Sequence, residues 1–454
     1  MTKTTKKVIS YTLTVFLTVT VCLPQAFAQS KEELQQEVAT LKKQLADAQA
    51  KLQAVETEKT QEISKLQSEL AEAKNRPAVT QSASNSDLLG DIRIGDFKFG
   101  GAIRANYVIG DYQSTPGPGR GDDGGNFELD TFRFNVDYAH EDWMGALEYR
   151  FYNGYNFLHT GWIGYQLDES STVKVGVNRV PFGPGPYGVS QSWFFDQHYY
   201  VGLSDDMDLG VKYTKNIDNL TVDAAYYYSG EGNWNGASKD SARYSYDVVN
   251  ETGNGYEERH QINFRGVYSL DIEGIATDLG LSAQYGLLES RGPQSDGDHY
   301  AASAHMVNKW DNWTLASQLT YYTYNVSNHT LESGAVSDDL IDMGAYDFAW
   351  PVAAEAYIPA ISLAYKYETK NIDWLEYVKP YIEYSAILKE ESNQNDSEML
   401  TVGAAWKRGG WYIYTDFAYS NGNYFVSNDD FTTFGANPND TWQYRFNINF
   451  GYYF

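Results

Sequence analysis

From about residue 91 to the last residue, apolar and polar positions alternate in short segments. In the first segment Phe97, Phe99, Ile103 and Tyr107 share one parity, and Lys98, Arg104 and other residues of the opposite parity lie between them. Strict alternation of this kind predicts a β-strand with one apolar face. Sixteen such strands are predicted, at about residues 93–109, 127–139, 143–152, 157–167, 172–180, 207–215, 219–229, 258–269, 277–288, 299–309, 312–325, 355–368, 375–388, 397–407, 411–420 and 441–454.

The connections between these segments are mostly short and long in turn. Tight turns such as HED, NID and RGG alternate with long excursions. Transmembrane β-barrels have short periplasmic turns and long outer loops, whereas a soluble β-sandwich or solenoid gives no reason for the alternation. We therefore predict an all-β fold for residues 91–454, a 16-stranded antiparallel transmembrane β-barrel.

Residues 29–76 follow a different, helical pattern. Between Ser30 and Arg76 there is no aromatic residue, Gly or Pro, and Leu34, Val38, Leu41 and Leu45 are spaced by four and three. This seam predicts an N-terminal α-helical coiled coil, which implies association of several chains. A lone solvated helix is the alternative. Residues 77–90 are predicted to be a linker.

The first 28 residues resemble a secretory signal peptide. Basic residues precede an apolar run that ends in Ala26-Phe27-Ala28, a small-residue cleavage site. An uncleaved membrane anchor is the alternative, but the run is short for a spanning helix. The single cysteine, Cys22, lies in this segment, so the mature chain is expected to have no disulfide and no thiolate metal site.

The distribution of charge sharpens the expected function. The formal net charge is −26, which argues against a general affinity for nucleic acid, and most acidic residues fall in the predicted long loops. Those acids either bind divalent cations or stay solvated; we expect solvation, with no metal site and no cofactor. The polar parity of the strands is instead rich in basic residues, which predicts a basic pore lining: Lys98, Arg104, Arg133, Arg150, Lys174, Lys212 and Arg265.

The excursion at residues 181–206 is the predicted constriction loop. Its three prolines stand among glycines and end the strand before it. Its residues of interest are Trp193, Phe195, Asp196, His198 and Tyr199. The aromatic side chains either wedge the loop against the inner wall or stack on sugar rings. Asp196 is expected to face Arg104, Arg133 and Arg150 across the pore, giving a transverse field that sorts solutes by charge. The alternative is that these arginines pair with Glu148 and Asp137 and serve only the wall.

The stretch VKVGVNRVPFGPGPYGVSQSWFFDQHYY, followed by DLGVKYTKN, resembles the phosphate-selective porins O and P of Gram-negative outer membranes. This resemblance implies a trimeric channel with its third loop folded inside and a preference for anions such as phosphate. The N-terminal coiled coil is similar to the periplasmic extension of some sugar-specific porins, which makes a sugar or oligosaccharide channel the alternative. The C-terminal Phe450, Tyr452 and Phe454 resemble the signal that the barrel-assembly machinery reads.

Together these features predict an outer-membrane porin for passive diffusion of small hydrophilic solutes, with a weak preference for anions. The expected partners are two further copies in a homotrimer, outer-membrane lipid and lipopolysaccharide, with the coiled coil in the periplasm. An outer-membrane hydrolase is the rival. We expect no enzyme, because the seven histidines are scattered and the chain has no G-x-S-x-G or H-E-x-x-H motif.

Overall fold

The structure is a computed structural model that describes residues 39–40, 42–44, 46, 51, 92–111, 125–426 and 431–454. The chain divides into two units, Met1–Ser84 and Asn85–Phe454. In the first unit the described residues are helical and exposed. The predicted signal peptide, most of the coiled coil and the linker lie outside the described residues. Within the described residues, no helix is long and apolar enough to cross a membrane.

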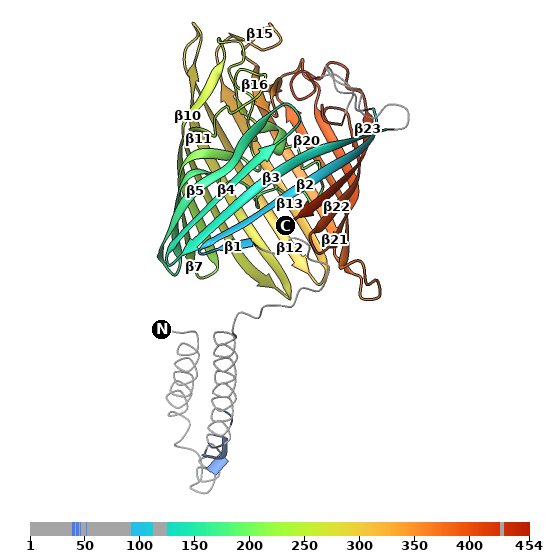
Figure 1. Ribbon diagram of the computed structural model, residues 1–454. Helices are drawn as coiled ribbons and strands as arrows, with labels where there is room; N and C mark the ends of the chain where they lie inside the picture. The colour runs from blue at the N-terminus through green and yellow to red at the C-terminus, as the bar shows by residue number, and fades with distance from the viewer. Residues whose placement is uncertain are drawn as a thin grey trace, which may run out of the picture. The chain divides into compact units, whose positions relative to one another are not determined.

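The second unit is a closed antiparallel barrel, which confirms the predicted 16-stranded barrel (Figure 1). Each strand pairs with the next in sequence, and β23 pairs with β2 to close the sheet. The barrel strands are β2 (Phe97–Gly110), β3 (Asn126–His140), β4 (Trp143–Phe151), β5 (Asn156–Asp168), β6 (Ser171–Arg179), β7 (Met207–Ile217), β8 (Leu220–Gly230), β10 (Tyr256–Ile272), β11 (Ile275–Ser290), β12 (Gly297–Trp310), β13 (Trp313–Asn325), β18 (Glu355–Tyr365) continued by β19 (Tyr367–Glu368), β20 (Tyr377–Lys389), β21 (Ser397–Arg408), β22 (Trp411–Ser420) and β23 (Gln443–Tyr453).

The prediction for the first strand was wrong in one detail. Residues 93–109 do not form a single strand, because the chain turns at Gly95, whose φ of 60° is readily adopted by glycine. Before this turn, β1 (Ile92–Ile94) pairs antiparallel with the start of β2, with Ile92 opposite Phe99. The chain therefore enters the barrel through a small hairpin.

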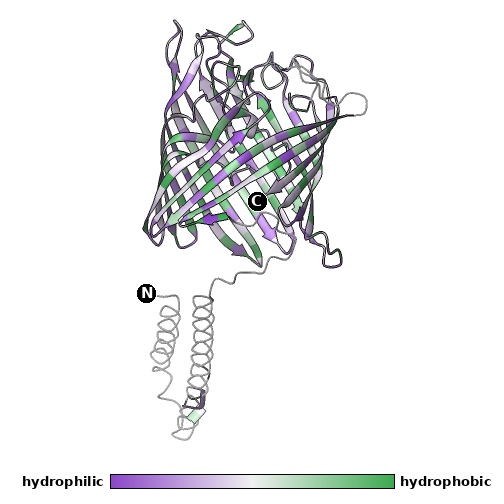
Figure 2. Cartoon of the chain, in the orientation of Figure 1, coloured by the Kyte–Doolittle hydropathy of each residue, from purple (hydrophilic) through white to green (hydrophobic). Residues whose placement is uncertain are grey.

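Hydrophobic and hydrophilic residues are interspersed along the barrel strands (Figure 2), and the two faces of the strands differ as the alternation predicted. In β2 the side chain of Ile103 is 48% exposed on the outer face, whereas its neighbour Ala102 is fully buried on the inner one. Each of the sixteen barrel strands pairs with a neighbour on both sides, so the barrel has no open edge within the described residues. An apolar outer surface on a sheet without edges is what a lipid bilayer requires.

The last strand closes the barrel near the predicted position. Ala102 of β2 stands opposite Tyr453, and the Phe454 backbone N–H donates to the Gly101 carbonyl at 3.0 Å. Arg445 is buried on the inner face of β23, and Tyr444 is exposed on the outer face. The parity predicted for the C-terminal segment is therefore confirmed, while the assembly role of Phe450, Tyr452 and Phe454 stays a prediction.

The long loops contain short strands that the sequence pattern does not reveal. β9 (Asp247–Val248), β16 (Leu340–Ala345) and β17 (Phe348–Ala353) form a small separate sheet, and β14 (His329–Thr330) pairs with β15 (Val336–Ser337). Aromatic side chains pack these loops together; the ring centroids of Tyr246 and Trp350 are 4.8 Å apart. The long loops, which lie at the end of the barrel opposite the short turns, thus share one apolar core.

Candidate solute channel

Residues 181–206, the inner loop, connect β6 to β7 and bond to the inner wall on strands far away in sequence. The Ser190 hydroxyl donates to Glu383 Oε2 of β20 at 2.8 Å, and the Trp193 backbone N–H donates to Asp416 Oδ2 of β22 at 2.9 Å. Gly183 N–H donates to the Ser282 hydroxyl of β11 at 3.1 Å. These hydrogen bonds fasten the loop to strands of the inner wall of the barrel.

Asp196 does not face the arginines, contrary to the prediction. Its Oδ2 accepts the Val189 N–H at 2.9 Å, and its Oδ1 accepts the backbone N–H of His198, also at 2.9 Å. The His198 imidazole lies against the same Oδ1 and, on its other side, against the Thr320 hydroxyl of β13 at 2.8 Å. Gly188, with φ of 60°, leaves room for the carboxylate where a Cβ would collide with it. Asp196 therefore holds the shape of the loop.

The aromatic residues of the inner loop are mostly buried in packing contacts. Phe194, Tyr199 and Tyr200 are buried, and Phe195 stacks on Tyr199 with ring centroids 4.0 Å apart. Trp193 lies beneath the Arg445 guanidinium at 5.0 Å from the ring centroid. Of the two interpretations given by the sequence, the wedge fits these rings better than a stacking surface.

The pore-facing arginines are brought together by the register of neighbouring strands. Arg133 of β3 stands directly opposite Arg150 of β4. Glu148 lies between them, 2.6 Å from Arg150 Nε and 3.5 Å from Arg133 Nη1. Arg104 of β2 pairs with Asp130 at 2.8 Å. A carboxylate beside each guanidinium offsets much of the repulsion between like charges.

The basic residues continue onto the next strands. Lys174 of β6 stands opposite Lys212 of β7, and Lys174 lies over the Trp162 ring at 4.0 Å. Arg265 of β10 contacts Asp223 at 3.1 Å and donates to the Gly183 carbonyl of the inner loop at 2.7 Å. The full set, which we call the basic arc, is Arg104, Arg133, Arg150, Lys174, Arg179, Lys212 and Arg265. The arc thus runs along the wall from β2 to β10.

Lys98, although predicted with this group, lies elsewhere. It stands opposite Asp137, beside the short turn that joins β3 and β4. Six positions separate it from Arg104, which is about 20 Å along a strand. Lys98 therefore belongs to the mouth of the barrel and not to the constriction.

Arg179 and Tyr187 were missed by the sequence pattern, yet both are prominent in the channel. The Arg179 side chain is 35% exposed, compared with 22% for Arg133 and 9% for Arg150. Arg179 pairs with Asp205 at 2.6 Å, and Tyr187, which is 51% exposed, has its ring 5.9 Å from the guanidinium. Arg179 is the last residue of β6 and occupies a position of the outward-facing parity, so the alternation does not predict that it faces the channel. Tyr187 follows a Pro-Gly-Pro run without any pattern.

Comparison with solved structures finds similar barrels. The outer-membrane channel DcaP of Acinetobacter baumannii matches with a TM-score of 0.52 and 11% identity, over 79% of this chain and 97% of that one. OprB of Pseudomonas putida matches with a TM-score of 0.49 and 10% identity, over 79% and 94%. An anion-selective porin from Comamonas acidovorans matches with a TM-score of 0.48 and 9% identity, over 79% and 99%. No protein-family model and no curated protein sequence matches this chain. The likeness to DcaP shows a shared fold.

Proposed function

We propose that this chain forms an outer-membrane porin for passive diffusion of small hydrophilic solutes and that the channel prefers anions. The barrel and its apolar outer face support a membrane channel, and the inner loop supplies a constriction. The basic arc carries the proposal for anions. Its seven positive groups are accompanied by four carboxylates, Asp130, Glu148, Asp205 and Asp223.

The exposed members of the arc set the expected selectivity. The side chains of Arg133 and Arg179 are 22% and 35% exposed, while their carboxylate partners, Glu148 and Asp205, are 13% and 2% exposed. A passing anion therefore meets donors that are held in place, and the low-dielectric wall of a narrow channel strengthens that interaction. Phosphate and other oxyanions fit the forked geometry of arginine.

The experiment is a reversal-potential measurement on single channels in a KCl gradient. We expect the wild-type channel to be anion-selective and Arg133→Gln/Arg179→Gln to shift toward cations. Lys366→Gln is the matched control, because Lys366 is exposed beside Glu368 at the short-turn end. A wild-type channel with strong cation selectivity would falsify the anion preference and leave only the porin part of the proposal.

A sugar channel is the second candidate, and exposed Tyr187 is the observation that favours it. Tyr187 packs edge-on against Phe195 with ring centroids 5.6 Å apart, beside Arg179. An aromatic face next to hydrogen-bond donors is suited to a sugar ring. Block of the open-channel current by malto-oligosaccharides but not by phosphate would favour this candidate over an anion channel.

Trimer formation, periplasmic placement of the coiled coil and insertion by the barrel-assembly machinery remain parts of the proposal that rest on the sequence. Deletion of residues 30–76 is expected to weaken the trimer, because the heptad seam is apolar. Cross-linking in outer-membrane vesicles rich in lipopolysaccharide tests this, with a deletion of residues 77–90 as the control. Unchanged trimers in the first deletion would show that the barrel alone is sufficient.

A further inference from the structure

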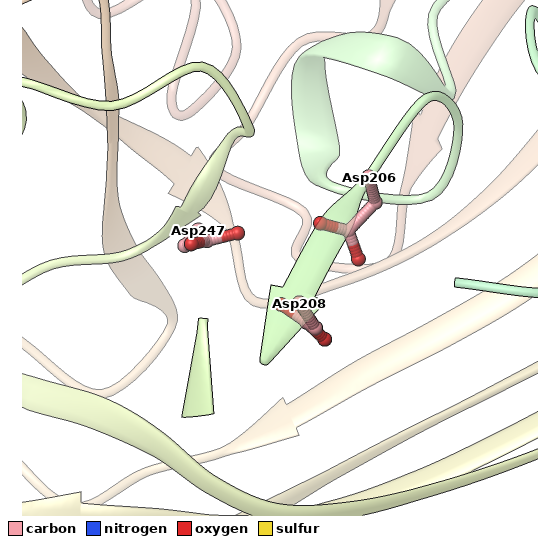
Figure 3. Close-up of side chains that lie close together, drawn as sticks. All are labelled: Asp206, Asp208 and Asp247. Carbon is pink, nitrogen blue, oxygen red and sulfur yellow. The ribbon is translucent and has the colours of Figure 1, made fainter. Parts of the chain in front are cut away.

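Three carboxylates meet where the inner loop joins β7. Asp206 ends the loop, Asp208 lies in β7, and Asp247 lies in β9 of the loop that follows β8. Each offers one oxygen, and the three oxygens lie within 4.8 Å of one another. Figure 3 shows the Asp206 and Asp247 carboxylates pointing toward each other, with Asp208 beside them. All three side chains are buried. We call this group the carboxylate pocket.

The oxygens of the pocket are incompletely satisfied. Asp206 Oδ1 and Asp208 Oδ1 are buried and have no hydrogen-bond partner. A buried polar atom without a partner is rare in a folded protein and unfavourable, above all in a carboxylate. These two oxygens therefore indicate a bound ligand that supplies the interaction partner which the protein does not provide.

Glu231 gives a second, separate observation. Its Oε1 accepts the backbone N–H groups of Tyr244 at 3.0 Å and Ser245 at 2.7 Å, while its Oε2 is buried without a hydrogen-bond partner. Burial raises the pKa of Glu231, and the Asp247 carboxylate is near enough to raise it further. Two neighbouring carboxylates repel each other, which favours a proton or a cation between them.

The positive charge that the protein supplies here is small. Arg243 Nη1 lies 2.8 Å from Asp247 Oδ2, but Nη2 of the same guanidinium lies 2.6 Å from Asp240 Oδ1. Asp208 receives only a neutral donor, the Gln261 amide at 3.1 Å. Among the ion pairs of the described residues, Arg243 is the one basic partner of the pocket, so a shortage of positive charge remains.

We propose that Asp206, Asp208 and Asp247, with Glu231 as a further ligand, bind one calcium ion. Carboxylate oxygens are the ligands that Ca²⁺ prefers, and the group offers no sulfur or imidazole for softer metals. The three oxygens lie within 4.8 Å of one another, and oxygens on opposite sides of Ca²⁺ are about 4.6–5.2 Å apart, so the pocket is small enough for one ion to contact all three. This site is independent of the anion preference proposed above.

Calcium at this position ties the inner loop to the outer loops. Asp206 directly follows Asp205, the partner of Arg179, and Asp247 stands opposite Gly344 in β16 of the small loop sheet. The bound ion thereby joins the end of the constriction to the loops above it. Its release is expected to loosen the inner loop without opening the barrel.

Protons are the competing occupant. Burial and the neighbouring carboxylates raise the pKa of Asp206 well above its ordinary value, and burial together with Asp247 does the same to the pKa of Glu231. Protonation satisfies the oxygens without any metal, so the experiment has to separate the two occupants.

The test uses the full chain refolded in detergent without lipopolysaccharide, which itself binds divalent cations. Isothermal titration with CaCl₂ is compared for wild type, Asp206→Asn/Asp208→Asn and the control Glu390→Gln/Glu391→Gln, which removes two exposed loop charges. We expect one saturable Ca²⁺ site in wild type and control, and affinity at least about tenfold weaker in the Asp206→Asn/Asp208→Asn protein. EDTA is expected to lower the thermal midpoint of the wild type and of the Glu390→Gln/Glu391→Gln control, and to leave that of the Asp206→Asn/Asp208→Asn protein unchanged.

Equal Ca²⁺ binding by wild type and the Asp206→Asn/Asp208→Asn protein, or no saturable site in wild type, overturns the proposal and assigns the pocket to protons. If the double variant does not fold, Asp247→Asn replaces it with Tb³⁺ as the probe. Tyr244 and Tyr246 lie in the same segment as Asp247 and are expected to sensitise Tb³⁺ luminescence that Ca²⁺ displaces. Luminescence that Asp247→Asn leaves unchanged refutes the site.

Discussion

The basic arc and the carboxylate pocket are two groups of like charges in one barrel, and they are compensated differently. In the arc, Arg133 and Arg150 share Glu148, and Arg104 has Asp130. In the pocket, three carboxylates share part of one guanidinium, and two of their oxygens have no partner. The arc is partly open to the channel, whereas the pocket is closed.

This difference separates two uses of charge. Charges that sort passing solutes have to remain accessible, and carboxylates at their rear keep the wall stable while they do so. Charges that are buried without compensation destabilise the fold unless a ligand completes them. The arc therefore fits transient contact with anions, and the pocket fits a resident cation.

The largest expected effect is loss of the shared carboxylate in the arc. Glu148→Gln leaves Arg150 buried without an anionic partner, which is expected to reduce the free energy of unfolding by roughly 3–5 kcal/mol. The measurement is denaturant unfolding in detergent. Asp137→Asn, an exposed change on β3, is expected to cost at most about 1 kcal/mol. Equal losses in the two variants would show that the arc needs no compensation.

The next effect has the opposite sign. Without calcium, and at a pH at which the carboxylates are ionised, Asp208→Asn removes one of three buried like charges and is expected to stabilise the protein by up to about 3 kcal/mol, the interaction of two unit charges about 5 Å apart at an effective dielectric constant near 20. With saturating calcium the same variant is expected to be less stable than wild type. Thermal unfolding in EDTA and in CaCl₂ measures both; a destabilised variant in EDTA contradicts the account.

Asp342 of β16 is a buried carboxylate that is not part of the carboxylate pocket. We therefore expect its contribution to stability to depend on pH and not on calcium. Burial raises its pKa from 3.8 to about 7. Because the folded state favours the protonated form, its stabilising contribution is complete below about pH 4 and is lost as pH rises toward 7.

Hydrogen exchange of residues 340–353, corrected for intrinsic rates, tests this difference. We expect protection to fall about tenfold between pH 4 and pH 8 in wild type and to change little in Asp342→Asn. Calcium is expected to have no effect on this pH dependence. An identical pH profile in the variant rules out Asp342 as the group responsible.

The smallest expected effect concerns the aromatic side of the constriction. Tyr187→Ala removes the exposed ring beside Arg179 and is expected to weaken block by an aromatic or sugar solute about two- to tenfold, with the anion selectivity kept. Tyr187→Phe, which retains the ring, is the control. Current-block titrations on single channels measure both variants, and an unchanged block by Tyr187→Ala assigns no role to the ring.

The sequence predicted the strands well because a two-residue period is a local property that every strand repeats. It also placed Arg133 and Arg150 on the inner face, since parity decides the face. It was wrong about the surroundings of Asp196, because the loop folds back so that Val189 and His198 use the carboxylate. No period describes a loop, and its hydrogen bonds depend on its path through the barrel.

By itself the sequence determined the strand segments and their two faces, with Arg133 and Arg150 on the inner one. Only the tertiary structure decided which residues meet: strand register placed Arg133 opposite Arg150, and closure of the barrel brought the inner loop against Asp416. The same holds for the carboxylate pocket, in which Asp247 lies about forty residues from its partners in the chain. Alternation is encoded residue by residue, whereas these contacts arise from long-range packing, which no local pattern specifies.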